Sequence, residues 1–211
     1  HKAVLAPVGE LEPEGFSAHV ISPDGSGRIS ADRFADALTD DVGLVSLMHV
    51  NNELGSVTPI EEIAAICRER GILLHCDAVQ SAGYFNWNLE EMGVDLLSMS
   101  GHKLYGPKGI GILYIRGGTD LRPIISGGGQ ERERRGGTEN VPAVVGMARA
   151  FELAVEEREE RRAHLMQLRK RLLDRLQQSL NGGFIRNGPG AEDQGAPHVV
   201  NIAFPPDRGG K

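Results

Sequence analysis

The sequence predicts an α/β fold, a three-layer sandwich with a mainly parallel sheet, followed by the start of a small α+β domain. Apolar runs at residues 43–50, 72–76 and 94–99 are rich in Leu and Val and are predicted as strands. A segment with helical spacing separates the first two runs, and such alternation is typical of a parallel sheet with helices on its faces. Gly and Pro, 28 and 11 of the 211 residues, mark the turns between these segments.

The first part of the chain predicts a strand, a turn and a short helix. Residues 16–21 are predicted as a strand, and the Pro-Asp-Gly turn at 23–25 follows. Ser30 can cap a helix over residues 31–40, because the apolar residues of that segment then share one face. This helix leads into the strand at 43–50.

The segment after that strand has the pattern of a buried helix. Thr58-Pro59-Ile60-Glu61 matches a capping box with Pro at the first helical position. Gly71 ends the helix. Its apolar positions form one stripe, made of Ile60, Ile63, Ala64 and Cys67.

A short helix around residues 90–91 and a strand over 110–115 complete the first domain, which we expect to span residues 1–150.

Residues 142–180 then read as one helical stretch, which would be about 55–60 Å long. We expect a break or a domain-bridging role, because this length is unusual for a globular helix. Residues 151–211 are assigned to this linking helix and the start of a small domain, with a strand over 198–204.

Composition and charge exclude several classes of protein. The chain has 23 Lys or Arg and 29 Asp or Glu, a net charge of −6, which argues against nucleic acid as a primary ligand. No apolar stretch reaches the roughly 18–20 residues of a membrane span. The two cysteines, Cys67 and Cys76, fit a reducing compartment, and we expect a cytoplasmic protein, or an organelle-matrix protein if a leader has been lost.

Polar side chains follow three of the predicted strands. Asn51 and Asn52 follow the first strand, and Asp77 follows the second, with Gln80 three residues later. The third strand is followed by residues 100–103, Ser-Gly-His-Lys. Ligands gather at the carboxyl ends of parallel strands, so these groups are expected on one rim of the sheet.

This set of groups suits pyridoxal 5′-phosphate (PLP). PLP needs a Lys for a Schiff base with its aldehyde, and a carboxylate near its pyridine nitrogen to keep that nitrogen protonated. It also needs donors for its phenolic oxygen and its phosphate. Lys103 stands at a strand end between such groups, and we interpret the rim as a PLP site.

Several segments resemble the cysteine desulfurases, which are class V, fold-type I PLP enzymes. Residues 100–109 (SGHKLYGPKG) resemble the family's Schiff-base lysine motif. The resemblance covers nearly the whole chain in the family's order. Its other matching segments are 1–5 (HKAVL), 49–55 (HVNNELG), 75–81 (HCDAVQS) and 127–140 (GGGQERERRGGTEN).

The resemblance assigns a role to each candidate residue. It implies that Lys103 holds PLP and then moves the Cα proton of the substrate, and that Asp77 binds the pyridinium nitrogen. It places Asn52 and Gln80 near the phenolic oxygen. The phosphate ligands that it implies are Ser100 and His102.

Two further roles imply an assembly with shared sites. His1 corresponds to the family's histidine that stacks on the cofactor ring and assists proton transfer. Thr138 resembles the threonine that reaches the phosphate of the neighbouring subunit. The resemblance therefore implies a homodimer.

The implied activity is the removal of sulfur from L-cysteine, which leaves L-alanine and an enzyme persulfide. The sulfur would pass to an acceptor or scaffold protein for iron–sulfur cluster or thio-cofactor assembly. The family's persulfide Cys loop and its amino-terminal phosphate loop have no counterpart in residues 1–211. We therefore expect an internal fragment that is inactive alone.

Other readings remain open at this point. The chain could belong to a selenocysteine lyase, a cysteine sulfinate desulfinase or another class V aminotransferase, or act as a non-catalytic dimerisation fragment. Cys67 and Cys76 lie in apolar patterns, so we expect small buried hydrophobes rather than sulfur carriers. We expect no metal site, because the cluster at 75–77 has no second set of ligands.

Overall fold

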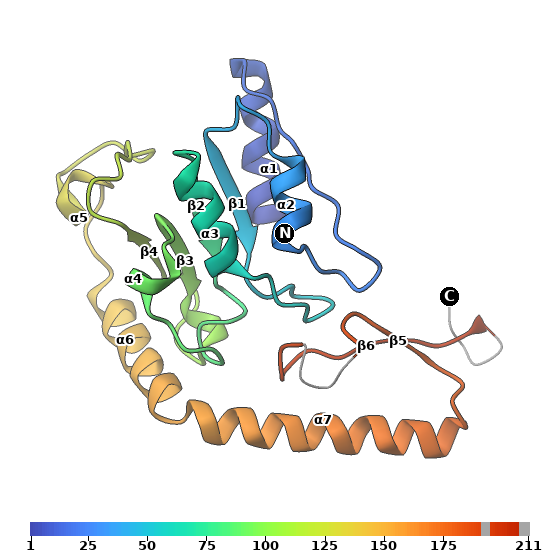
Figure 1. Cartoon of the computed structure of the whole chain (residues 1–211). Helices are drawn as coiled ribbons and strands as arrows, with labels where there is room; N and C mark the ends of the chain where they lie inside the picture. The colour runs from blue at the N-terminus through green and yellow to red at the C-terminus, as the bar shows by residue number, and fades with distance from the viewer. Residues whose placement is uncertain (191–194, 207–211) are drawn as a thin grey trace.

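A four-stranded sheet in the order β1-β2-β3-β4 organises the larger part of the chain in this computed structural model (Figure 1). The first three strands are parallel, and β4 runs antiparallel to β3. This confirms the prediction of an α/β fold with a mainly parallel sheet. The strands are β1 (Leu44–Met48), β2 (Leu73–Asp77), β3 (Leu96–Ser100) and β4 (Gly111–Ile115).

The structure describes residues 1–190 and 195–206; the carboxyl-terminal residues 207–211, on which part of the expectation of a fragment depends, lie outside them. A second sheet pairs β5 (Ile185–Asn187) with β6 (Asn201–Ala203) in antiparallel fashion. The described helices are α1 (Lys2–Leu11), η1 (Glu12–Glu14), α2 (Ala31–Ala37), α3 (Ile60–Glu69), α4 (Leu89–Met92), η2 (Gly101–Lys103), α5 (Gln130–Glu133), α6 (Val141–Glu156) and α7 (Arg158–Leu180).

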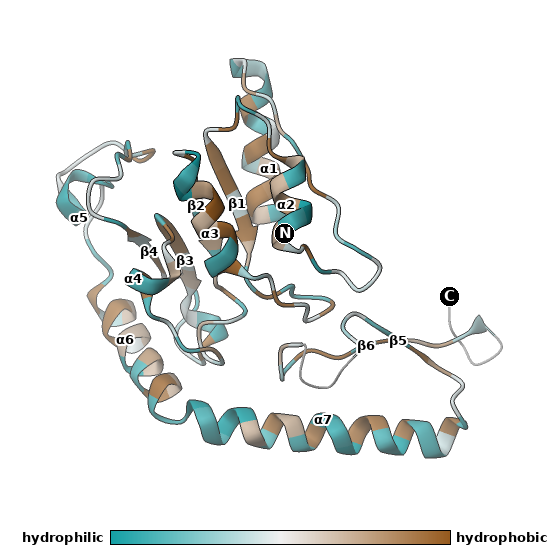
Figure 2. Ribbon diagram, in the orientation of Figure 1, coloured by the Kyte–Doolittle hydropathy of each residue, from teal (hydrophilic) through white to brown (hydrophobic). Residues whose placement is uncertain are grey.

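The hydrophobic core lies between α3 and one face of the four-stranded sheet. Figure 2 shows this apolar pairing as brown segments of α3 and of the neighbouring strands. The predicted stripe of α3 is confirmed, because all four of its residues are buried. The sheet contributes the alternate residues of its strands, namely Val45, Leu74, Cys76, Leu97 and Met99.

Both cysteines belong to this core. Burial raises the pKa of the Cys67 thiol to about 11, and it also raises that of Cys76. A thiol that stays protonated is a poor nucleophile. The expectation that these residues act as small hydrophobes agrees with this placement.

The start of α3 differs from the predicted capping box. Pro59 is the N-cap residue, and no side chain caps the helix. The hydroxyl of Thr58 instead donates to the carbonyl oxygen of Met48 at 2.7 Å, at the end of β1. The capping-box prediction was wrong because this strand end competes for the same hydroxyl. At α2, by contrast, the predicted cap is confirmed, since Ser30 Oγ accepts from the N–H of Arg33 at 3.2 Å.

The predicted strand at residues 16–21 does not form. Gly15 ends η1 with a left-handed φ of 94°, and the chain beyond it is irregular. Phe16 and Val20 stay largely exposed. Within the described residues, no strand pairs with this segment, so its alternating pattern lacks the partner that a strand requires.

The predicted break in the long helix is confirmed at Glu157, which separates α6 from α7 and has non-helical φ and ψ of −97° and 6°. A 2.6 Å ion pair joins its carboxylate to Arg161 one turn later. α7 ends at Asn181 in a left-handed conformation. None of the described helices is both long and apolar enough to cross a membrane.

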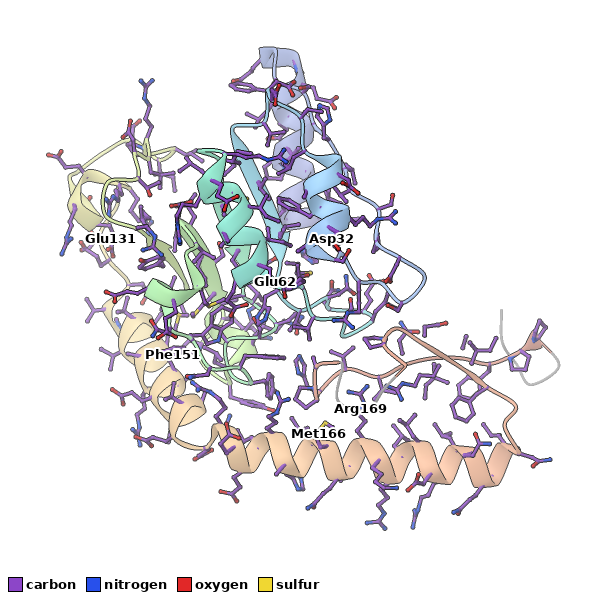
Figure 3. All side chains as sticks on the ribbon, in the orientation of Figure 1. Asp32, Glu62, Glu131, Phe151, Met166 and Arg169 are labelled. Atoms are coloured by element: carbon purple, nitrogen blue, oxygen red, sulfur yellow. The ribbon has the colours of Figure 1, made fainter. Side chains whose placement is uncertain are left out.

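The chain beyond α7 returns to the end of β1. The N–H of Ala196 donates to the carbonyl oxygen of Gly55 at 2.8 Å, and Gly195 forms a bridge with Ser56. Arg169 of α7 is only 6% exposed, and its Nη1 donates to the Ala196 carbonyl oxygen at 2.8 Å. Figure 3 shows its side chain on the side of α7 that faces the small sheet. The helix therefore holds the returning segment against the loop that follows β1.

Replacing Arg169 with Leu should release this segment. The change removes a buried, charge-assisted hydrogen bond worth about 1.5–3 kcal/mol, so the melting temperature should fall and the Ala196 amide should exchange faster. Hydrogen exchange with mass spectrometry measures the second effect. The control is Lys170→Ala, which removes an exposed ion pair with Asp174 of at most about 1 kcal/mol. Equal exchange in both variants would contradict the assigned role.

Candidate active site

The register of the sheet brings the ends of β1 and β2 to the same level, and β3 continues two residues further, to Ser100. Met48 pairs with Asp77, and Asp77 pairs with Ser98 on its other side. The loops that follow the three strands therefore begin at one rim. This is the arrangement that the sequence predicted for the polar residues after each strand.

Asp77 is a buried carboxylate at the end of β2. It is 8% exposed, and its Oδ1 accepts a hydrogen bond from the N–H of Val79 at 3.0 Å. Its backbone carbonyl accepts from the N–H of His49 at 3.0 Å, which fixes it against the end of β1. Among the described residues, no Lys or Arg forms an ion pair with this carboxylate.

The loop after β3 carries Lys103 at the end of the short helix η2. Lys103 is exposed, while Gly101 is buried and holds the loop in place. The N–H of Gly101 donates to the Ile110 carbonyl at 3.0 Å, and its own carbonyl accepts from Gly106 at 2.9 Å. Tyr105 has a left-handed φ of 63°, an unfavourable conformation for its side chain that this tight loop imposes.

Ser100 and His102 form a hydrogen-bonded pair at the start of the same loop. Ser100 Oγ and His102 Nδ1 are 2.7 Å apart. The pair lies at the end of β3, one strand away from Asp77. A hydroxyl and an imidazole at this position can donate to an anionic oxygen.

The loop after β1 distinguishes its two asparagines. Asn51 Oδ1 accepts from the backbone N–H groups of Glu53 and Leu54 at 3.0 and 2.9 Å, which closes a tight turn. Because the side chain of Asn51 already stabilises this turn, the half-buried side chain of Asn52 is not needed to stabilise the turn. Gln80 lies half-buried in the turn after β2.

His1 and Thr138 are both exposed and lie outside this group. His1 caps α1, with its Nδ1 accepting from the N–H of Ala3 at 3.1 Å. Thr138 lies in the loop between α5 and α6. No hydrogen bond within the described part of the chain joins either residue to the rim, and their roles stay predictions.

Two histidines near the rim were not proposed from the sequence as site residues. His198 stacks on Tyr84 with ring centroids 4.1 Å apart, and burial, together with the charge of Lys103, lowers its pKa to about 4. His49 packs edge-on against Phe85 and Trp87. His49 lies inside the strand predicted at 43–50 and follows β1 only in the structure, and His198 lies 95 positions after Lys103, so no signal in the sequence indicated either residue.

Comparison with known proteins decides the family. A family description, aminotransferase class-V, matches residues 1–206. The chain belongs to the class-V aminotransferase family. The chain is also similar to a curated relative named cysteine desulfurase IscS from Dictyoglomus turgidum, with 42% identity over 204 residues.

Solved structures of this family share the fold of the chain. A NifS-like protein matches 98% of the chain with a TM-score of 0.91 and 40% identity, over 56% of its own length. A structure described as SspA in complex with cysteine matches 99% with a TM-score of 0.83 and 38% identity, over 57% of its own length. The curated match covers 97% of this chain and 51% of the relative, so the chain spans about half the length of the curated relatives it matches.

Gly101 should tolerate no side chain. An added Cβ would lie 2.8 Å from Ile110 Cγ2 and 2.9 Å from the Pro107 carbonyl oxygen. Gly101→Ala should therefore destabilise the protein by about 1–3 kcal/mol, which thermal denaturation measures. Gly43→Ala is the matched control, because its Cβ would meet nothing within 4 Å. A melting temperature that is the same in both variants would show that the loop adapts.

Acid should destabilise the fold through His49. The side chain is 7% exposed, and burial lowers its pKa to about 4, although Glu61 opposes this. The unfolded chain, with a pKa of about 6.5, binds the proton more tightly, so this contribution to stability is lost as pH falls from about 6.5 to about 4, up to about 3 kcal/mol.

Urea unfolding across this pH range tests the effect. His49→Asn should flatten the acid dependence of the unfolding midpoint, while His164→Asn, at an exposed position of α7, should leave it unchanged. The same acid slope in His49→Asn and in the unaltered protein would contradict the assignment.

Proposed function

We propose that this chain forms the cofactor-binding part of a PLP-dependent cysteine desulfurase. One observation carries the proposal: Asp77 is a buried carboxylate without a Lys or Arg partner in the described residues, on the same rim as Lys103. Buried charges in proteins are normally paired. A ligand that brings a positive ring nitrogen to this carboxylate would supply the missing partner.

The donor set of the rim fits PLP. The primary amine of Lys103 is exposed and suits the aldehyde of the cofactor, and Asp77 suits the pyridinium nitrogen. The hydrogen-bonded Ser100–His102 pair offers donors for phosphate oxygens. Asn52 and Gln80 offer amide groups for the phenolic oxygen.

When bound, PLP supplies an electron sink for a carbanion at the substrate Cα. Asp77 would hold the ring nitrogen in its protonated form. The Lys103 amine would hold the cofactor and would move the proton at the substrate Cα. The close packing around Gly101 holds this amine at the end of β3.

L-cysteine is the proposed substrate, with its sulfur passed to an acceptor or scaffold protein. The similarity to a cysteine desulfurase and to a structure described with cysteine supports this choice. We further propose a homodimer, in which Thr138 serves the phosphate of the other subunit and His1 stacks on the ring. In this proposal, residues 1–150 form the large domain, and residues 151–211 form the linking helix and the start of the small domain.

The experiment is PLP capture by the full-length protein. Borohydride reduction followed by mass spectrometry should find the reduced cofactor on Lys103 in the unaltered protein and none at that position in Lys103→Ala. Lys108→Ala, an exposed lysine of the same loop, should keep full labelling. Labelling elsewhere, with Lys103 unmodified, would refute the assignment.

Desulfurase activity needs its own measurement. The full-length protein should release alanine from L-cysteine, and Lys103→Ala should lower this rate by several orders of magnitude. PLP capture without any alanine release would retain the cofactor site and refute the proposed reaction.

A further inference from the structure

A row of polar side chains crosses the sheet just below the rim. It consists of Ser46 on β1, His75 on β2 and Ser98 on β3. Ser46 Oγ lies 2.7 Å from His75 Nδ1, and Ser98 Oγ lies 2.8 Å from His75 Nε2. One imidazole therefore joins three adjacent strands through their side chains.

Both ring nitrogens of His75 have a hydroxyl partner in this row. Burial lowers the pKa of His75, although the Asp77 carboxylate opposes this shift. A neutral imidazole has one donor and one acceptor, and a serine hydroxyl can complement either. Both ring nitrogens thus have a partner, and the ring cannot rotate without losing a hydrogen bond.

The row lies on the same face of the sheet as the rim residues. Side chains two apart on a strand share a face, so His75 is followed on its face by Asp77, and Ser98 is followed by Ser100. The opposite face carries the apolar core. The His75–Ser98 bond therefore ties together the two strands that end in Asp77 and in the Ser100–His102 pair.

We propose that His75 is a positioning residue that, through Ser98, sets the Asp77 carboxylate relative to the Ser100–His102 pair. This inference rests on the proposed function, in which these two groups hold opposite ends of PLP. A ligand that spans two strands is sensitive to their relative position, because both of its contacts must be made at once. Ser46 ties β2 only to β1 and has a smaller part.

The two serines provide a matched pair of variants in the full-length protein. Ser98→Ala should weaken PLP affinity about fivefold, the equivalent of one hydrogen bond. It should also change the visible circular dichroism of each bound PLP, which reports the tilt of the ring. Ser46→Ala should change affinity by less than about twofold and leave that dichroism as it is.

Two more variants separate positioning from general loss of stability. Ser98→Thr keeps the hydroxyl on a residue suited to strands and should restore both affinity and dichroism. His75→Phe keeps a planar ring without hydrogen bonds and should behave like Ser98→Ala or worse. A loss of stability alone would lower the melting temperature and the bound fraction without altering the dichroism of the PLP that is bound.

The outcomes distinguish this inference from the proposed function. An unaltered protein that binds no PLP refutes the proposed function and this inference with it. An unaltered protein that binds PLP, with Ser98→Ala unchanged or indistinguishable from Ser46→Ala, refutes the positioning role alone. Weakened affinity with altered dichroism in Ser98→Ala, and recovery in Ser98→Thr, supports it.

Discussion

Strand β2 is hydrogen-bonded to β1 on one side and to β3 on the other, and this backbone pairing holds together the region in which the polar candidate residues meet. β1 and β3 run parallel to β2, so three chain segments leave the sheet in one direction, with β3 two residues longer than β1 and β2 at this end. The apolar face of these strands is fixed by α3, and this leaves the other face free to carry polar side chains. The candidate residues lie close together because the strands that carry them are adjacent in the sheet, although the residues are far apart in the sequence.

The electrostatics of that polar face depend on the hydrogen-bond or charge partner that each group has. Two hydroxyls hold the imidazole of His75, and burial lowers its pKa, which disfavours a positive charge two residues before Asp77 on the same face of β2. The carboxylate of Asp77 consequently keeps its capacity for a cation from outside the described chain.

The parallel strands and the rim residues were predictable, because short apolar runs and the polar residues after them are local patterns. The same local reasoning failed at residues 16–21, which find no partner strand among the described residues, and at Thr58, whose hydroxyl bonds to a competing carbonyl. The antiparallel direction of β4 depends on the tight turn that precedes it. His198 comes near Lys103, and Arg169 reaches Ala196, only through tertiary packing, and no spacing in the sequence indicates where their segments meet.

The contact between Ala196 and Gly55 also bears on how the protein is made. Synthesis proceeds from the amino terminus, so the loop after β1 exists long before the segment that covers it has left the ribosome. During that interval the loop after β1 lacks its contacts at Gly55 and Ser56, and it has to be held by its own turn and by the sheet alone.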